Sequence, residues 1–204
     1  RDLVRSRGLG DVYKRQDAGF APAAVILATA MMYARLLALI ALLGHVRAAL
    51  ALALPFGGLF LASLALAGGL AWRARGASTQ PHPTVSANPL DLPVAFLFAG
   101  LFVLFAFITQ LVTTRFGASG LHVLSFAVGF SDIDPFILSL LDGKFAVSPQ
   151  AVTAAILIAS ASNNLLKAAY ALGFSRHRAM LPAALWLCAC LLYTSDAADE
   201  EDSV

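Results

Sequence analysis

Long apolar runs separated by short polar breaks dominate the middle of the chain. A helical run of roughly 18 or more apolar residues can cross a hydrocarbon layer of ~30 Å. The breaks contain the basic, proline and glycine residues expected where helices end at a membrane surface. We therefore expect an all-α, polytopic membrane helical bundle of about six transmembrane spans. The predicted spans are 21–44, 49–72, 90–112, 119–141, 149–172 and 179–189.

Glycine, proline and serine mark where the predicted helices should begin and end. Gly117 and Gly120 lie in the break between the third and fourth spans. Ser148-Pro149 opens the fifth span, because serine caps free backbone N–H groups and proline at the first helical position loses no needed donor. Residues 73–90 form a linker rich in Pro, Ser and Thr, which we expect to be a flexible aqueous loop.

Both ends of the chain differ from this pattern and resemble translated sequencing-library adapter. Residues 6–16 have the sequence SRGLGDVYKRQ, and residues 190–200 have the sequence CLLYTSDAADE. One adapter element, translated in opposite orientations, encodes part of both stretches. Such segments are set aside before a fold is predicted. We expect residues 1–16 and 190–204 to be adapter-derived, and residues 17–189 to be the native transmembrane domain, as a fragment.

Composition excludes several classes of soluble function. The two ends hold five of the 14 basic and seven of the 12 acidic residues, which leaves nine basic and five acidic residues between them. Without the ends Cys188 is the single cysteine, so we expect no disulfide and no cysteine-based metal site. Neither a glycine-rich phosphate loop nor a basic–aromatic nucleic-acid patch is present, so we expect no cofactor and no nucleic-acid partner. The histidines lack metal-ligand spacing; they are His45, His82, His122 and His177.

The segment GFSDIDPF places two carboxylates inside the fourth predicted span. Gly129, Ser131, Asp132 and an Asp134-Pro135 helix-start signal follow one another within seven residues. We expect the helix to stop near Gly129 and to restart at Pro135. Broken helices of this kind present carboxylates and backbone dipoles to ions or substrates in transporters. The alternative is that both aspartates cap a re-entrant helix packed inside the protein.

The fifth predicted span carries a polar face. Ser160, Asn163, Asn164 and Lys167 have the spacing i, i+3, i+4, i+7, and Thr153 lies two turns earlier on the same face. We expect this face to contact other helices or water. Two alternatives remain open: the side chains belong to a functional site, or they only bond helix to helix while Lys167 extends to the membrane surface.

Arg35 lies close to the middle of the first predicted span. An ionisable side chain at that depth is costly unless it is paired or hydrated. With alternating span directions, Arg35 and the aspartates have similar depths, whereas Lys167 lies ~10 Å from the middle of its span. We therefore expect an Arg35–Asp132 or Arg35–Asp134 ion pair, either within a functional site or as a purely structural contact.

The order NPLDLP, GFSDIDPFILSL and ASNNLLKAAYAL resembles the C-terminal membrane domain of bacterial MgtC/SapB-type proteins, the domain of unknown function 4010. The resemblance covers nearly all of 17–189, and Arg35 falls in a helix that resembles the family's Arg-containing span. Pro135 and Phe136 depart from the small or polar residues expected there, and Asn164 replaces a hydroxyl. The resemblance implies an MgtC-like N-terminal domain as a partner in the full-length protein. The positions that match the family pattern are Gly129, Asp132, Asp134, Ser139, Asn163 and Lys167.

Together these features predict a multi-pass protein of the bacterial inner membrane that is not an enzyme. Its partners would be the lipid bilayer, the MgtC-like domain and further copies in a homo-oligomer. The leading hypothesis is a mid-membrane polar site that binds or translocates a cation, proton or small solute. The alternative is a regulatory or assembly domain without transport. An intramembrane aspartyl protease ranks last, because it needs two catalytic aspartates on separate spans, whereas Asp132 and Asp134 lie in one segment.

Overall fold

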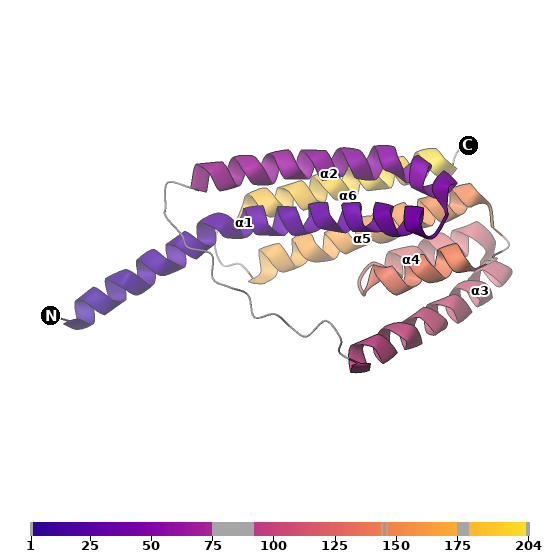
Figure 1. The fold of residues 1–204 in the computed structure, drawn as a ribbon, viewed down its shortest axis with the longest axis horizontal. Coiled ribbons are helices and arrows are strands. Elements are labelled where there is room, and N and C mark those ends of the chain that lie inside the picture. The colour runs from indigo at the N-terminus through magenta and orange to yellow at the C-terminus, as the bar shows by residue number, and fades with distance from the viewer. Residues whose placement is uncertain (1, 75–91, 144, 146, 175–179, 203–204) are drawn as a thin grey trace.

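The described part of the chain is almost entirely helical. In the computed structural model the structure describes residues 2–74, 92–143, 145, 147–174 and 180–202. These residues form six α-helices and no strand, so the predicted all-α fold is confirmed. Most of the linker predicted at 73–90 lies outside the described residues. The helices are α1 (Asp2–Leu42), α2 (Val46–Ala74), α3 (Leu92–Val128), α4 (Ile133–Asp142), α5 (Pro149–Phe174) and α6 (Leu181–Asp202) (Figure 1).

Five of these helices are long and apolar enough to cross a membrane, which indicates a multi-pass membrane protein. This agrees with the predicted bundle of about six spans with a broken fourth span: among the described residues, the segment after the break is too short to cross by itself. α4 has only 10 residues, a rise of ~15 Å against the ~30 Å of a hydrocarbon core. The five candidate spans are Ala21–Leu42, Val46–Ala74, Ala95–Val128, Pro149–Gly173 and Leu181–Glu200.

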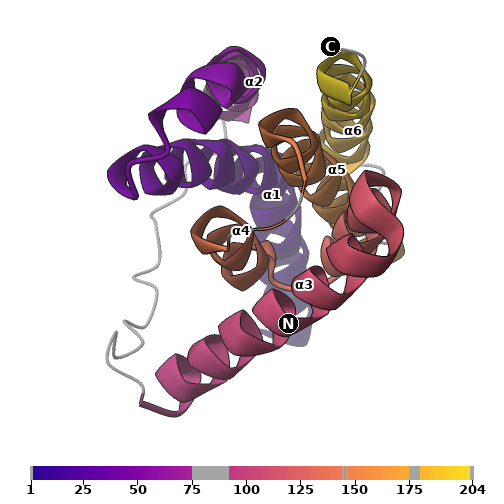
Figure 2. The ribbon, with the colours of Figure 1, turned by 90° about the vertical axis from the view of Figure 1, so that its right-hand side faces the viewer.

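The predicted fourth span is a re-entrant hairpin. α3 has one non-helical residue, Gly117 (φ 60°, ψ −143°), after which its last part turns back along the bundle. Figures 1 and 2 show this last part and α4 running side by side in opposite directions. Gly143, at the end of α4, lines one pocket together with Gly44 and Pro149, so α4 ends where α5 begins. At the tip of the hairpin, a Cβ on Gly129 would collide with Ser162, which lies ~20 Å along α5 from Pro149. The hairpin therefore begins and ends at the same side of the bundle, and its tip lies at middle depth.

Gly117 explains why the predicted turn became a sharp bend. A positive φ with this ψ is a backbone conformation that is essentially restricted to glycine. No atom would lie within 4 Å of a Cβ at this position, so the glycine is required by the backbone and not by packing. The bend lets two half-length helices occupy the place of one span.

Helix ends follow the sequence signals with one correction. α5 begins at Pro149 as predicted, and the backbone N–H of Ala151 donates to Ser148 Oγ at 3.1 Å. α4 begins at Ile133 and not at Pro135. Asp132 is its N-cap, and proline anywhere in the first turn still loses no intrahelical bond.

The described ends of the first and last helices extend beyond the predicted spans. α1 is continuous from Asp2, and α6 continues past residue 189 to Asp202. The stretches interpreted as adapter-derived are thus partly helical. Their origin stays a prediction.

α5 is the central helix of the bundle. It packs against α2, α3, α4 and α6, and Figure 2 shows it between α1, α4 and α6. Small side chains allow this close packing, because the helix backbones can approach one another. The fully buried alanines on α5 include Ala154, Ala155 and Ala159. The polar face of α5 therefore lies inside the protein and not against lipid.

Candidate functional site

The tip of the re-entrant hairpin is a tight acidic turn between two half-helices. α3 ends at Val128, whose carbonyl accepts from both the backbone N–H and the Oγ of Ser131, each at 2.8 Å. Asp132 then caps α4, and its Oδ1 accepts from the backbone N–H of Asp134 at 3.2 Å. The turn thus places one carboxylate at the start of α4 and a second one in its first turn.

Gly129 brings this tip into contact with α5. A Cβ at this position would collide with the side chain of Ser162 and lie 2.6 Å from the carbonyl oxygen of Ala159. The Gly129 carbonyl accepts from Asn163 Nδ2 at 3.1 Å. Only glycine permits this approach of the turn to the helix, so Gly129 has a positioning role in the structure.

Arg35 on α1 forms an ion pair with Asp134, with 2.6 Å between the Arg35 guanidinium nitrogen and Asp134 Oδ2. This contact confirms one of the two pairs predicted from the sequence. The Asp134 side chain is 11% exposed and that of Arg35 is 56% exposed. The other carboxylate oxygen of Asp134 is buried and has no hydrogen-bond partner among the described residues. The pair links the hairpin to α1 and leaves Asp134 dependent on Arg35.

The polar face of α5 contacts both α1 and the hairpin. Asn164 Nδ2 donates to the Tyr33 hydroxyl at 2.6 Å, and Lys167 Nζ lies 2.9 Å from Met32 Sδ. A thioether is a weak acceptor for an ammonium group. No carboxylate within the described residues lies within 4 Å of Lys167 Nζ, so this cation has no strong partner there.

The predicted site residues divide into two groups. Five of them line one cavity of about 600 Å³, which we name the polar cavity; its other lining residues are Ala28, Met31, Met32 and Ile133. The remaining four support its walls: Gly129 and Asp134 in the hairpin, and Ser160 and Asn164 on α5. The five lining residues are Arg35, Ser131, Asp132, Asn163 and Lys167.

The polar cavity lies at the middle depth of the bundle. Asp132 precedes the C-terminal residue of α4, Asp142, by ~15 Å of helix, which is half of a ~30 Å hydrocarbon layer. Met31 and Met32 occupy the centre of the span Ala21–Leu42 on the opposite wall. Polar groups from three separate helical segments therefore converge at a depth where the surrounding lipid has no polar groups.

The re-entrant hairpin also corrects the depth predicted for Lys167. Because the hairpin returns to its own side, α5 runs in the opposite direction from that of the six-span prediction. Lys167 lies past the middle of its span toward Gly173, and Arg35 lies past the middle of its span toward Leu42, so the two residues lie on opposite sides of the middle depth. They nevertheless line the same cavity, because the cavity extends along α1 from Ala28 to Arg35.

The charges of the polar cavity limit what it can bind. Asp134 neutralises Arg35, which leaves Asp132 and Lys167 as lining charges of opposite sign. No group of three or more His, Cys, Asp or Glu side chains able to hold a metal ion occurs within the described part of the chain. Asn163 Nδ2 donates one N–H to the Gly129 carbonyl, so its second N–H and its amide oxygen remain for a ligand. The cavity is thus dipolar, with one acidic and one basic contact.

Sequence reasoning did not identify three residues that shape this site. Tyr33 and Met32 are the partners of the α5 polar face, and Ser162 is the side chain against which Gly129 packs. Tyr33 gave a weak signal, because it is a hydroxyl-bearing residue two positions from an intramembrane arginine. Met32 and Ser162 gave none, since an apolar run predicts neither a thioether contact nor a close helix approach.

Comparison with known proteins identifies the family but no activity. The model of the family described as domain of unknown function (DUF4010) matches residues 10–175. A protein of Aquifex aeolicus described as an uncharacterized protein is 34% identical over 110 residues, which are 53% of this chain and 48% of the relative. The chain therefore spans about half the length of the curated relative it matches. No solved structure matches the chain.

Proposed function

The chain belongs to the family of domain of unknown function DUF4010, and we propose that it is a membrane carrier whose polar cavity binds a small dipolar solute. The sequence left three species open: a cation, a proton and a small solute. The opposite charges of Asp132 and Lys167 in one cavity favour the solute. A bare cation would meet the Asp132 carboxylate and the Lys167 ammonium group beside the neutralised Arg35–Asp134 pair, so the cavity has no net negative charge to attract it.

The observation that carries this proposal is the polar cavity itself. A volume of about 600 Å³ lies within the ~300–1,000 Å³ that small-molecule sites occupy. It lies at the end of a half-helix and opens to one face of the bundle, where Ser131 and Asp132 are exposed. Transporters also present substrate groups at the ends of half-helices at mid-membrane. Asp132 would contact the positive group of the solute and Lys167 its negative group, while the Arg35–Asp134 pair would hold the hairpin tip.

The first test measures thermal unfolding of the purified full chain in detergent. The probes are glycine, alanine and glycine betaine as dipolar solutes, and sodium and magnesium chloride as cations. A ligand at ten times its Kd stabilises the folded state by ~1.4 kcal/mol, which raises Tm by roughly 3–6 °C. We expect at least one dipolar solute to produce this rise, and Asp132→Asn and Lys167→Gln to abolish it.

Asp142→Asn is the matched control, because Asp142 lies on the same helix and does not line the cavity. It should keep the full rise. The stabilising solute is then tested for uptake into proteoliposomes. A rise with magnesium or sodium alone would overturn the proposal in favour of a cation site. Equal rises in the wild type and in both cavity variants would show that the solute binds elsewhere.

A non-transporting regulatory or assembly domain is the second candidate, and one observation favours it. Both asparagines of the α5 polar face bond to neighbouring segments, Asn163 to Gly129 and Asn164 to Tyr33. In this function the polar face stabilises helix packing only. Asp132→Asn and Lys167→Gln would then change folding or oligomeric state, and none of the probes would bind or cross the membrane.

We further propose the setting in which the domain works. The resemblance to MgtC/SapB-type proteins supports a multi-pass location in the bacterial inner membrane, without enzymatic activity. A partner of the MgtC-like kind would occupy the part of a longer protein that this chain does not cover. Exposed apolar side chains on α3, such as Phe96, Val103 and Phe107, fit contact with lipid or with another copy in a homo-oligomer.

A further inference from the structure

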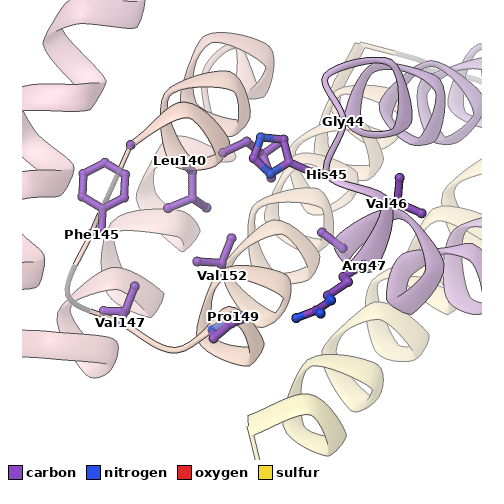
Figure 3. Close-up of a pocket in the computed structure, with 12 residues that line it drawn as sticks. Gly44, His45, Val46, Arg47, Leu140, Phe145, Val147, Pro149 and Val152 are labelled. Atoms are coloured by element: carbon purple, nitrogen blue, oxygen red, sulfur yellow. The ribbon is translucent and has the colours of Figure 1, made fainter.

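A second pocket lies at the end of the bundle where α1 is joined to α2. We name it the turn pocket; it has a volume of about 560 Å³. Residues 44–48 form one wall, the end of α4 around Leu140 forms another, and the start of α5 around Val152 forms the third (Figure 3). It shares no lining residue with the polar cavity.

The geometry of the α1–α2 turn fixes one wall of this pocket. Gly44 adopts φ 85°, and its N–H donates to the Ala41 carbonyl at 3.1 Å while the His45 N–H donates to the Ile40 carbonyl at 3.2 Å. These two bonds form the glycine-dependent Schellman motif that ends a helix. His45 is thereby held in the turn at the pocket, and Arg47 follows in the first turn of α2.

The turn pocket carries one positive charge. Arg47 is the one charged residue among its lining residues, and Figure 3 shows its side chain extending toward the Pro149 end of α5. No carboxylate within the described ranges lies within 4 Å of the Arg47 guanidinium. The first turns of α2 and α5 contain no acidic residue, although each is the positive end of a helix. An arginine placed there without a partner favours an anion.

The body of the pocket is apolar. Leu140, Phe145, Val147 and Val152 supply hydrocarbon and aromatic surface beside the arginine. The pocket also lies at the level where the spans ending at Leu42 and starting at Val46 and Pro149 meet the membrane surface. A ligand that satisfies both parts has an anionic head and an apolar chain, and the phosphate of a phospholipid lies at this level.

We propose that the turn pocket binds an anionic phospholipid. Its phosphate contacts Arg47, and the first part of an acyl chain lies between Leu140 and Val152. The lipid thereby joins α2, α4 and α5, and so supports the outer end of the re-entrant hairpin. This proposal does not depend on the solute bound in the polar cavity.

The test uses native mass spectrometry of the full chain in detergent with phosphatidylglycerol or phosphatidylcholine. One basic residue near a membrane surface contributes ~1 kcal/mol to anionic lipid binding, so we expect Arg47→Gln to lower the affinity for phosphatidylglycerol about fivefold. Arg47→Lys should keep most of the affinity. Arg115→Gln is the control, because Arg115 is an exposed arginine that does not line the pocket. It should bind as the wild type does.

A second variant tests the apolar part. Val152→Phe places an aromatic ring where the acyl chain would lie, without changing the charge of the pocket. It should lower phosphatidylglycerol affinity while circular dichroism shows the helical content of the wild type. The proposal is overturned if the two lipids bind the wild type equally, or if Arg47→Gln binds phosphatidylglycerol as tightly as Arg115→Gln does. It is also overturned if inorganic phosphate in tenfold excess displaces the lipid, because the site would then recognise free phosphate.

Discussion

Breaking the Arg35–Asp134 ion pair from its two sides should give unequal losses of stability. Arg35→Met removes the guanidinium and keeps a long apolar side chain, which leaves the Asp134 carboxylate buried without its one ion-pair partner. Asp134→Asn leaves Arg35, whose side chain is 56% exposed and faces the polar cavity. The stranded arginine can be hydrated in the cavity, whereas the stranded carboxylate cannot.

The magnitude follows from the burial of each partner. Removing one member of a buried pair costs ~3–5 kcal/mol, and exposed pairs contribute ~0–1 kcal/mol. Asp134 is 11% exposed and Arg35 is half exposed, so the pair is intermediate. We expect Arg35→Met to lower the free energy of unfolding by about 2–3 kcal/mol and Asp134→Asn by about 1 kcal/mol. The double variant should lose less than the sum, because it strands no charge.

Unfolding by SDS titration from mixed micelles measures these free energies, with helical content as the signal. Arg73→Met is the control, because Arg73 is an exposed arginine at the end of α2, and it should change stability by less than ~0.5 kcal/mol. Equal losses for the two single variants, or strict additivity in the double variant, would refute the inference that the pair is coupled and that Asp134 is its buried member.

Three further substitutions test the packing around the site, each measured by the same titration. Gly129→Ala should cost about 1–3 kcal/mol, because its Cβ collides with Ser162; no loss would show that the hairpin tip is not in close contact with α5. Gly117→Ala should cost about 1–2 kcal/mol from backbone strain alone, since its Cβ has free space; a neutral result would contradict the sharp bend. Tyr33→Phe should cost about 1–3 kcal/mol by leaving the buried Asn164 amide without its acceptor, and unchanged stability would contradict that hydrogen bond.

The sequence was sufficient to predict the helices that cross the membrane, because apolar length is a direct physical requirement of a span. The break before Asp132 and the start of α5 at Pro149 were also predicted, since capping chemistry is local. The Arg35–Asp134 contact followed from the cost of an unpaired charge in lipid. Each of these inferences needs only a short stretch of sequence or a single energetic constraint.

Contacts between distant segments were not predictable in the same way. Residues 119–141 have the length and hydropathy of a crossing span, and the same residues fold as two antiparallel halves. What distinguishes the two outcomes is the positive φ at Gly117 and the packing of Gly129 against Ser162. Neither the backbone angle at Gly117 nor the contact of Gly129 with Ser162 can be inferred from amino-acid composition. The turn pocket was missed for the same reason, because Arg47 and Val152 come together only when α4 returns to the side on which it started.

The re-entrant path of the hairpin, more than the number of its carboxylates, is what places acidic groups at mid-membrane. In a continuous helix from Gly117 to Asp142, the backbone N–H groups near Asp132 would all be bonded within the helix. Because the chain turns there, α4 has a free N-terminal end, and Asp132 uses one carboxylate oxygen to cap it. The positive end of α4 and the Arg35 guanidinium then stabilise two carboxylates at a depth where isolated charges are costly. Straightening the hairpin would remove this stabilisation, so the site and the re-entrant fold depend on each other.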